Sequence, residues 1–278
     1  MRSAPAISLS RIALASIRLA TRARPLPFGQ GLPAHLGAFA TRIGVLGSEW
    51  YEFRPGLWMQ LNVQDLVQQT ILLEDIWDPA LTSLIESTLK PGDVLVDVGA
   101  HVGYFTLLAA SRVGPAGRIL SIEPNPVALD QLRHNVERSR LQNVLIAHTA
   151  CGDSRDPVRL YLHTESNSSM ASLSSENATS GVAVDVSCTP LDDVCLEGGL
   201  GRISLVRIDV EGAEFSVLRG MSRLLRETRP VVVLEMEPRL LGSFGTTRDS
   251  IVALLAEYDY RVAPLGGHSN YVCHPDCA

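Results

Sequence analysis

Long hydrophobic runs are missing from this chain of 278 residues. The first 24 residues mix five arginines with isoleucines and leucines. No uninterrupted apolar stretch there approaches the roughly 20 residues that a membrane-spanning helix needs, so we expect no transmembrane segment. The same arginines interrupt the positions where a secretory signal has a continuous apolar core, which argues against secretion.

Acidic residues are missing from the N-terminal extension, residues 1–48, which holds six arginines and no Asp, Glu or Lys. It fits three interpretations: an organelle transit peptide, an amphipathic helix on an anionic membrane surface, or a helix packed on the domain or a disordered leader. The rest of the chain carries a net charge of −12 within a total of −6. Nucleic-acid phosphates would meet a repulsive field there, so DNA and RNA substrates are disfavoured. We expect a cytoplasmic protein, with organelle targeting or peripheral membrane contact through the extension as alternatives.

Cysteine is scarce and odd in number. The five residues are Cys151, Cys188, Cys195, Cys273 and Cys277. This scattered set suits a reducing compartment better than a disulfide framework. The segment from Cys273 to Cys277 resembles half a zinc site, but a tetrahedral site needs four ligands and the sequence has no second cluster. We therefore predict no metal.

Hydrophobic residues make up 46% of the chain and charged residues 19%, which is typical of a globular domain. From about residue 92, short apolar runs alternate with helical patterns, which predicts a mostly parallel α/β sheet with helices on both faces. The expected strands are Val94–Val98, Arg118–Ile122, Val144–Thr149, Arg159–His163, Val182–Cys188, Leu205–Val210, Val231–Leu234 and Asn270–Cys273. The expected helices begin near Tyr104 and at Pro126 and span Glu214–Leu225 and Ser250–Glu257. The stretch 164–181 is rich in Ser, Thr and Asn, which predicts a surface loop over the site.

The most informative stretch is Val94-Leu-Val-Asp-Val-Gly-Ala-His-Val-Gly-Tyr-Phe-Thr106. Gly99 and Gly103 let the backbone turn tightly after a buried strand and approach a ligand before a helix begins. Glu123 ends the next strand, 26 residues after Asp97. A carboxylate at that strand end accepts hydrogen bonds from a ribose diol, so the pattern predicts a nucleoside-cofactor site.

The glycine loop lacks the middle glycine of a dinucleotide site and carries His101 between its two glycines. A carboxylate at Asp97 would repel a pyrophosphate, but it suits a ligand that carries an ammonium and a sulfonium. The loop therefore favours S-adenosylmethionine over a nicotinamide cofactor.

At these residues the chain resembles the FkbM family of S-adenosylmethionine-dependent methyltransferases. The resemblance covers about residues 75–264 and lies in four blocks: Asp97-Val-Gly-Ala-His-Val-Gly-Tyr-Phe-Thr106, Glu123-Pro-Asn-Pro126, Thr189-Pro-Leu-Asp-Asp193 and Arg207-Ile-Asp-Val-Glu-Gly-Ala-Glu214. It implies a class I methyltransferase fold, Rossmann-like and doubly wound with a seven-stranded sheet. It also implies, in many members, O-methylation of a sugar, lipid or natural-product hydroxyl. Two positions depart from the family pattern: His101 stands where Asn is usual, and Glu237 lies near a position where many members carry a His.

Open parallel sheets bind ligands at the carboxyl ends of their strands, where this chain gathers acids. The candidate cofactor residues are Asp97, Gly99, Ala100, His101, Gly103, Glu123 and Asp153. We assign Glu123 to the ribose hydroxyls, and Asp97 with the glycine loop to the methionine part. Asp153 is a candidate for the adenine amino group or, equally, a turn residue in Gly152-Asp-Ser.

Asp209 and Glu211 are the candidate catalytic bases, because they end a strand where donor and acceptor should meet. Strand alternation would place both on one face, with Val210 pointing away. The alternative is that one of them caps the helix beginning near Ala213 while the other pairs with an arginine.

Three further assignments surround that pair. Glu214 is expected to lie on the helix itself and to be structural. His101 and His163 are alternative bases, although a loop hydrogen bond is the simpler use of His101. Carboxylates at the strand ends also suit Mg²⁺ or Ca²⁺, a minority hypothesis that nothing in the spacing demands.

We therefore predict a methyltransferase that uses S-adenosylmethionine, with a small hydroxylated acceptor: a carbohydrate, a lipid or a secondary metabolite. The alternatives are a nicotinamide-dependent oxidoreductase and a non-catalytic binding module that keeps the fold. The expected organisation is the N-terminal extension over residues 1–48, helical or disordered, and a methyltransferase domain over residues 49–278. The domain begins with its own N-terminal cap region, residues 49–74.

Overall fold

The computed structural model describes residues 48–62, 65–162, 171–177, 182–266 and 269–276. The N-terminal extension therefore lies outside the described residues except for its last position, and so do His163 and Cys277. Within the described ranges, no helix has the length and apolar character that crossing a bilayer requires.

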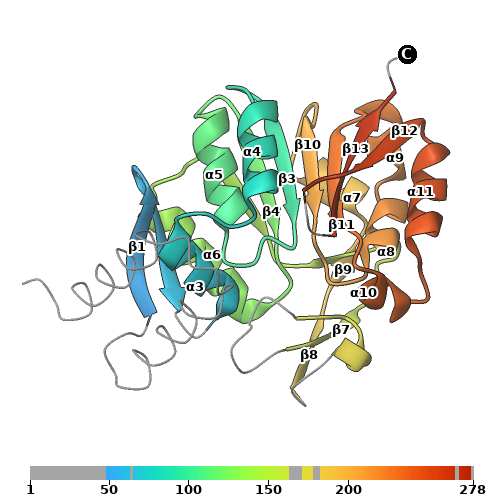
Figure 1. Cartoon of the computed structure of the whole chain (residues 1–278), viewed down its shortest axis with the longest axis horizontal. Helices are drawn as coiled ribbons and strands as arrows, with labels where there is room; N and C mark the ends of the chain where they lie inside the picture. Colours follow the sequence, from blue (N-terminus) through green and yellow to red (C-terminus); the bar gives the residue numbers. More distant parts are fainter. Residues whose placement is uncertain (1–47, 63–64, 163–170, 178–181, 267–268, 277–278) are drawn as a thin grey trace, which may run out of the picture.

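A seven-stranded sheet forms the centre of the molecule, with strand order β12-β13-β11-β10-β3-β4-β5 (Figure 1). The strands are β3 (Val94–Val98), β4 (Arg118–Ile122), β5 (Val144–Ala147), β10 (Leu205–Ile208), β11 (Val231–Glu235), β12 (Tyr260–Pro264) and β13 (Asn270–Pro275). Five neighbours run parallel from β5 to β11, and β13 pairs antiparallel with both β11 and β12. This is the predicted mostly parallel sheet, with the last strand inserted between β11 and β12 rather than added at the edge.

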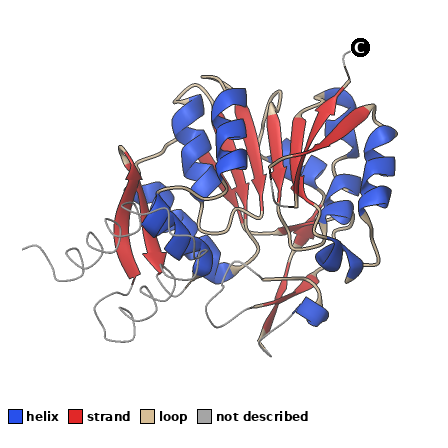
Figure 2. Cartoon of the chain, in the orientation of Figure 1, coloured by secondary structure: helices blue, strands red, loops and turns tan. Residues whose placement is uncertain are grey.

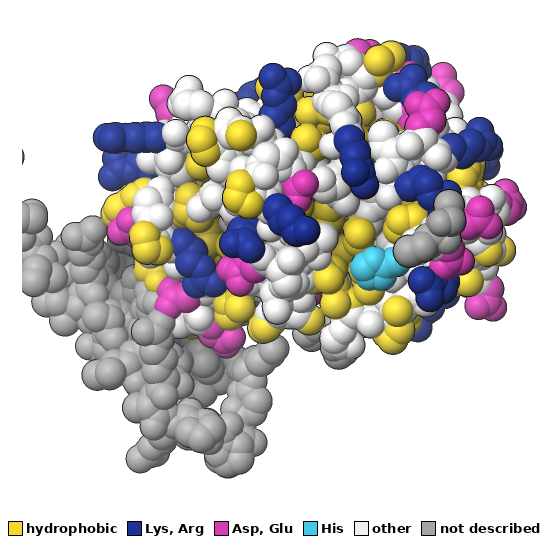
Figure 3. All heavy atoms as spheres, turned by 90° about the horizontal axis from the view of Figure 1, so that it is seen from above, with side chains coloured by type: hydrophobic (Ala, Val, Ile, Leu, Met, Phe, Trp, Pro, Cys, Tyr) yellow, Lys and Arg dark blue, Asp and Glu magenta, His cyan; other side chains and the backbone are white. Residues whose placement is uncertain are grey.

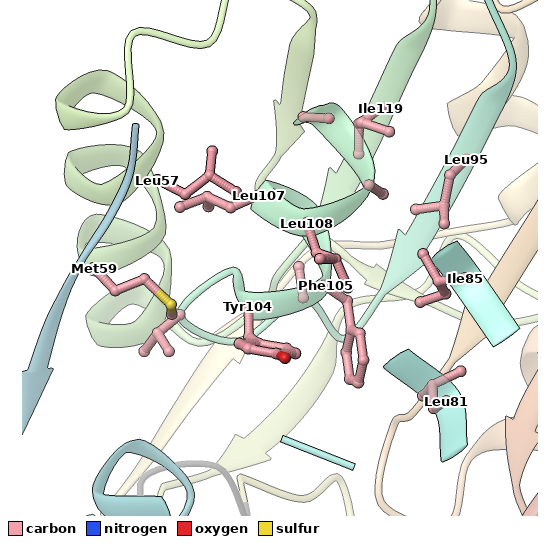
Figure 4. Close-up of a cluster of buried hydrophobic side chains, with 14 of the residues drawn as sticks. Leu57, Met59, Leu81, Ile85, Leu95, Tyr104, Phe105, Leu107, Leu108 and Ile119 are labelled. Carbon is pink, nitrogen blue, oxygen red and sulfur yellow. The ribbon is translucent and has the colours of Figure 1, made fainter. Parts of the chain in front are cut away.

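Helices cover both faces of this sheet (Figure 2). One group is α4 (Pro79–Thr88), α5 (Tyr104–Val113) and α6 (Pro126–Arg138); the other is α7 (Leu191–Glu197), α8 (Glu214–Arg219), α9 (Ser222–Glu227), α10 (Pro238–Gly242) and α11 (Arg248–Ala256). Successive strand residues point to opposite faces, so Leu95 packs in one core while Val96 packs in the other. Figure 4 shows the first core, where Phe105 and Leu108 of α5 lie near Leu95 and near Ile85 of α4. The doubly wound class I arrangement is confirmed.

The cap region is a β-hairpin followed by a helix: β1 (Ser48–Arg54), β2 (Leu57–Asn62) and α3 (Leu66–Glu74). A hydrogen bond from main chain to side chain joins the hairpin to α6, since the Gln60 amide donates to Asn135 Oδ1 at 2.7 Å. The Arg138 guanidinium lies 5.5 Å from the Trp50 ring centroid and 5.2 Å from that of Trp58. Gln68 of α3 accepts from Gln131 Nε2 of α6 at 2.8 Å, which holds α3 beside α6, and α3 contributes to the cavity described below.

Several element boundaries differ from the expected ones. The single helix expected over Glu214–Leu225 is divided into α8 and α9 at Gly220. A Cβ on Gly220 would lie 2.0 Å from the carbonyl oxygen of Gly152, so close packing of this turn needs glycine. The two strands expected around the polar loop form short pairs outside the main sheet: β7 (Val158–Tyr161) with β8 (Ala183–Val186), and β6 (Ala150–Cys151) with β9 (Cys188–Thr189).

Charge is mixed on the face of the molecule seen from above. Figure 3 shows Lys and Arg side chains interspersed there with Asp and Glu and with apolar atoms. That face therefore offers no continuous stripe of one sign.

Candidate functional site

A cavity opens where the parallel strands end. Its walls come from α3, the glycine loop, the ends of β4, β10 and β11, and the segment around Leu173: Val67, Ile71, Trp77, Val98, Gly99, Ala100, His101, Val102, Tyr104, Phe105, Ile122, Glu123, Pro124, Asn125, Thr149, Ala150, Cys151, Leu160, Ala171, Leu173, Arg207, Asp209, Val210, Glu211 and Glu235. The cavity lies at the edge of the sheet where open α/β folds bind ligands.

The glycine loop is held against the sheet by its own backbone. The amides of Gly99 and Ala100 both donate to the Ile122 carbonyl, at 2.9 and 3.1 Å. A Cβ on Gly99 (φ 80°) would lie 1.9 Å from the Asp209 carbonyl oxygen, and one on Gly103 (φ 94°) would lie 2.5 Å from Leu132. Both glycines are thus required by contacts within the protein as well as by left-handed backbone.

Gly103 begins α5 as its N-cap residue and is not on the cavity wall, contrary to our expectation for a cofactor contact. Gly99, Ala100 and His101 do line the cavity. Burial lowers the pKa of His101, against the opposing effect of Asp65 and Asp209, so the imidazole is kept neutral.

Glu123 lies at the end of β4, 6% exposed, and faces the cavity. Its Oε2 accepts from the His101 amide at 2.7 Å and its Oε1 accepts from the Asn125 amide at 2.8 Å. Burial raises the pKa of this carboxyl to about 7, and the two amide bonds oppose that rise. Each oxygen keeps a further lone pair, so the carboxylate can still accept from two ligand hydroxyls.

Asp97 requires a correction. It is completely buried and does not line the cavity. Its Oδ1 accepts from Arg207 Nη1 at 2.8 Å and its Oδ2 accepts from Thr106 Oγ1 at 2.8 Å. Asp97 therefore lies behind the cavity wall, paired with Arg207, and not on the wall where we expected it.

Arg207 is the central residue that the sequence prediction missed. Its side chain is 8% exposed, it also donates to the Gly99 carbonyl at 3.0 Å, and it pairs with Asp209. The guanidinium lies 4.7 Å from the Phe105 ring centroid. One detectable signal was present, since Arg207 is the only charged residue in the otherwise apolar strand Leu205–Ile208.

Asp153 also lies off the cavity wall, on the exposed side of its turn. It accepts from Ser216 Oγ at 2.8 Å and forms an ion pair with Arg219 at 3.3 Å. The structure thus supports the turn alternative for this residue. The wall next to Glu123 is made instead by Asn125 and by the run Thr149–Cys151.

Asp209 and Glu211, the two candidate bases, line the cavity from a loop and not from the alternating positions of a strand as expected. β10 ends at Ile208, and Glu211 has a left-handed backbone with φ 56°, so strand alternation does not apply beyond that point. Val210 lines the cavity as well, contrary to expectation, together with Asp209 and Glu211. Burial, Asp209 and Glu235 raise the pKa of Glu211 to about 9.

The neighbouring acids have distinct surroundings. Glu214, the first residue of α8, is buried and accepts from the amides of Val210 and Gly212 at 3.1 and 3.2 Å, which agrees with a structural role. Glu237 accepts from the Ser269 hydroxyl. Glu235, the last residue of β11, lines the cavity half-buried, and burial and Asp209 raise its pKa to about 8.

Apolar side chains that carried no sequence signal complete the cavity: Val67, Ile71, Trp77 and Phe105. The described part of the polar loop contributes Ala171 and Leu173. Over the residues that the structure describes, no group of three or more His, Cys, Asp or Glu is arranged to hold a metal ion.

The comparison with protein families decides the identity of this cavity. Residues 97–262 match the model of the methyltransferase FkbM domain. The chain belongs to this family. S-adenosylmethionine is therefore the expected cofactor, and the described residues fit it, because the buried carboxylate of Glu123, the glycine loop and further carboxylates line one cavity.

Curated relatives of this FkbM chain differ widely in length. Methyltransferase sdnD of Sordaria araneosa is 32% identical over 208 residues, which is 63% of this chain and 76% of the relative. The 31-O-demethyl-FK506 methyltransferase FkbM of Streptomyces tacrolimicus is 27% identical over 201 residues, covering 63% and 75%. AMB antimetabolite synthetase AmbE of Pseudomonas aeruginosa is 26% identical over 254 residues, which is 78% of this chain but 12% of that protein.

Among solved structures, a methyltransferase FkbM from Methylobacillus flagellatus is similar with a TM-score of 0.47 and 15% identity. The match covers 75% of this chain and 54% of that one.

Proposed function

We propose that this FkbM methyltransferase domain transfers a methyl group to a hydroxyl oxygen of a small acceptor, such as a carbohydrate, a lipid or a secondary metabolite. The observation that carries the proposal is that carboxylates after β10 and β11 line the same cavity as the glycine loop and Glu123. A hydroxyl acceptor needs a group that removes its proton as the new bond forms, and carboxylates serve that purpose.

The names of relatives support oxygen as the acceptor atom. The 2-O-methyltransferase NoeI of Sinorhizobium fredii is 30% identical over 161 residues, which is 54% of this chain and 64% of the relative. The hexuronic acid methyltransferase AglP of Haloferax volcanii is 24% identical over 168 residues. Oxygen is named as the acceptor atom for NoeI and for the FK506 methyltransferase, and a hexuronic acid as the substrate for AglP.

The roles of the residues follow from their positions. The donor, when bound, supplies a methyl group already activated by the sulfonium, so the protein mainly aligns donor and acceptor. We assign Glu123 to the ribose hydroxyls and the backbone of Gly99, Ala100 and His101 to the methionine part. Arg207 holds this loop and Asp209 in one arrangement.

We propose that residues 49–278 act as one methyltransferase domain and that the cap region, residues 49–74, helps to select the acceptor. Val67 and Ile71 of α3 support this role, because they line the cavity together with Trp77. Peripheral membrane contact through residues 1–48 stays a prediction.

The decisive experiment is calorimetric titration of the full chain with S-adenosylmethionine and, separately, with NAD⁺ and NADP⁺. Saturable micromolar binding of S-adenosylmethionine alone supports the proposal. The protein is then incubated with donor carrying a ¹³C-labelled methyl group and a panel of hydroxylated sugars, lipids and polyketides, followed by mass spectrometry. Label transferred only to amines or carbon acceptors would overturn O-methylation, and binding of neither cofactor would favour a non-catalytic module.

A further inference from the structure

Carboxylates from two adjacent strands converge beside the glycine loop. β10 and β11 are parallel neighbours in which Ile208 pairs with Leu234, so the next residues along, Asp209 just after β10 and Glu235 at the end of β11, follow at the same edge of the sheet. Both line the cavity, and Glu211 lines it two residues after Asp209. The carboxyl ends of these strands therefore bring three acids to one wall.

The acids around this wall differ in how they are held. Asp209 is paired with the Arg207 guanidinium, so its carboxylate already has a partner within the protein. Glu123 accepts from two backbone amides, and Glu237 accepts from Ser269.

Glu211 and Glu235 are the exceptions. No hydrogen bond or ion pair of their carboxylates is found within the described parts of the chain, although both lie half-buried on the cavity wall. Of the two, Glu235 is the more precisely placed. It is the last residue of a regular strand between two neighbours and pairs in register with Asn270 of β13, whereas Glu211 sits on a loop. Groups on regular elements are positioned more exactly than groups on loops.

We propose that Glu235, supported by Glu211, accepts the proton of the acceptor hydroxyl, and that it is prepared for this by releasing its own proton when the cationic donor binds. This inference rests on the proposed methyl transfer. In the step itself, an oxygen lone pair forms the bond to the methyl carbon and the carbon–sulfur bond breaks, with its electron pair going to sulfur. The hydroxyl proton passes to the Glu235 carboxylate and from there to solvent, so atoms and charge balance.

The charges around Glu235 explain why a cation should displace its proton. Burial is the main cause that raises the pKa of Glu235, to about 8. Asp209, Glu214 and Glu237, which face it from the β10 end, α8 and the start of α10, raise the pKa further, while Arg207 alone among these groups lowers it, so the carboxyl is mostly protonated at neutral pH. A positive charge placed beside the pair favours the ionised form, and a proton leaves.

The test compares S-adenosylmethionine with S-adenosylhomocysteine, which shares the ribose and the amino acid but has a neutral sulfur. Titration of Glu123 near the ribose affects both ligands, so it largely cancels in the ratio of their dissociation constants. The measurement is that ratio by calorimetry at pH 6.5 and pH 8.5 in wild type, in Glu235→Gln and in the control Glu227→Gln, whose glutamate is exposed on α9 and lies off the cavity wall. The amino group of each ligand also titrates between pH 6.5 and pH 8.5. Because this group is the same in every experiment, its effect on the dissociation constant cancels when wild type and variants are compared with the same ligand.

In wild type and in Glu227→Gln, the preference for S-adenosylmethionine over S-adenosylhomocysteine should increase by roughly tenfold between pH 6.5 and pH 8.5, because one proton is released on binding. In Glu235→Gln most of this increase should vanish, while S-adenosylhomocysteine still binds with wild-type affinity and so shows that the site is folded. An increase in Glu235→Gln as large as in wild type would overturn this inference alone. Failure of wild type to bind S-adenosylmethionine at either pH would instead overturn the proposed function.

Discussion

Removing the guanidinium of Arg207 should lower the free energy of unfolding of the protein by a large fraction of its total. Arg207→Met deletes the partner of Asp97, which is completely buried, and leaves that charge with only the Thr106 hydroxyl. Loss of one partner from a buried ion pair costs about 3–5 kcal/mol, and the side chain is 8% exposed, so solvent screening does not reduce the effect. This is a large part of the roughly 5–15 kcal/mol that stabilises a domain.

The assay is urea denaturation followed by circular dichroism, with the free energy of unfolding of Arg207→Met compared with wild type. The double variant Asp97→Asn/Arg207→Met removes both charges and should recover more than half of the loss. If Arg207→Met lowers the free energy of unfolding by less than about 1 kcal/mol, the reasoning is refuted, because only a solvent-exposed ion pair contributes so little to stability. A double variant as unstable as the single one would show that packing on Phe105, rather than charge, is the main contribution of Arg207.

Three further outcomes follow from the same site. Gly99→Ala should lower the free energy of unfolding by more than about 1 kcal/mol in a urea titration, since its Cβ would meet the Asp209 carbonyl at 1.9 Å; an unchanged midpoint contradicts the close contact. Glu123→Gln should weaken S-adenosylmethionine binding by roughly 10- to 100-fold in calorimetry, because a charged hydrogen bond to the ribose is lost; wild-type affinity would remove Glu123 from that role. The folded-state pKa of Glu211 is raised to about 9 from 4.5, so its stabilising effect is full below about pH 4.5 and is lost as the pH rises towards 9. Glu211→Gln should therefore flatten the fall in unfolding free energy across that window, and an equally steep fall would contradict the burial of this carboxyl.

The parts of the site that could be predicted from the sequence depend on local patterns. The apolar run Val94–Val98, the two glycines and the acid at the next strand end lie within 30 residues, and each has one simple structural solution. The helix start expected at Pro126 was likewise found, and the side chain of Asn125 caps it by accepting from the Val127 amide. Periodicity and capping chemistry are short-range properties, so one sequence suffices to read them.

The missed parts depend on contacts between distant residues. Asp97 pairs with Arg207, 110 positions away, and the pairing exists only because β3 and β10 are neighbours in register, with Asp97 opposite Arg207. Without that register, Asp97 looks like a ligand-facing acid. The split between α8 and α9 has the same origin, because the Gly152 carbonyl that lies against Gly220 belongs to another turn.

Arg207 also sets which wall of the cavity can move. It ties the ends of β3 and β10 to the Gly99 carbonyl, and Gly99 in turn abuts the Asp209 backbone, so the sheet side of the cavity is one cross-linked block. The opposite wall, α3 and the segment Ala171–Leu173, belongs to the cap region and the polar loop, outside the sheet. We therefore expect the rate at which spent cofactor is released to respond more to substitutions in α3 than to substitutions in the strands of this block.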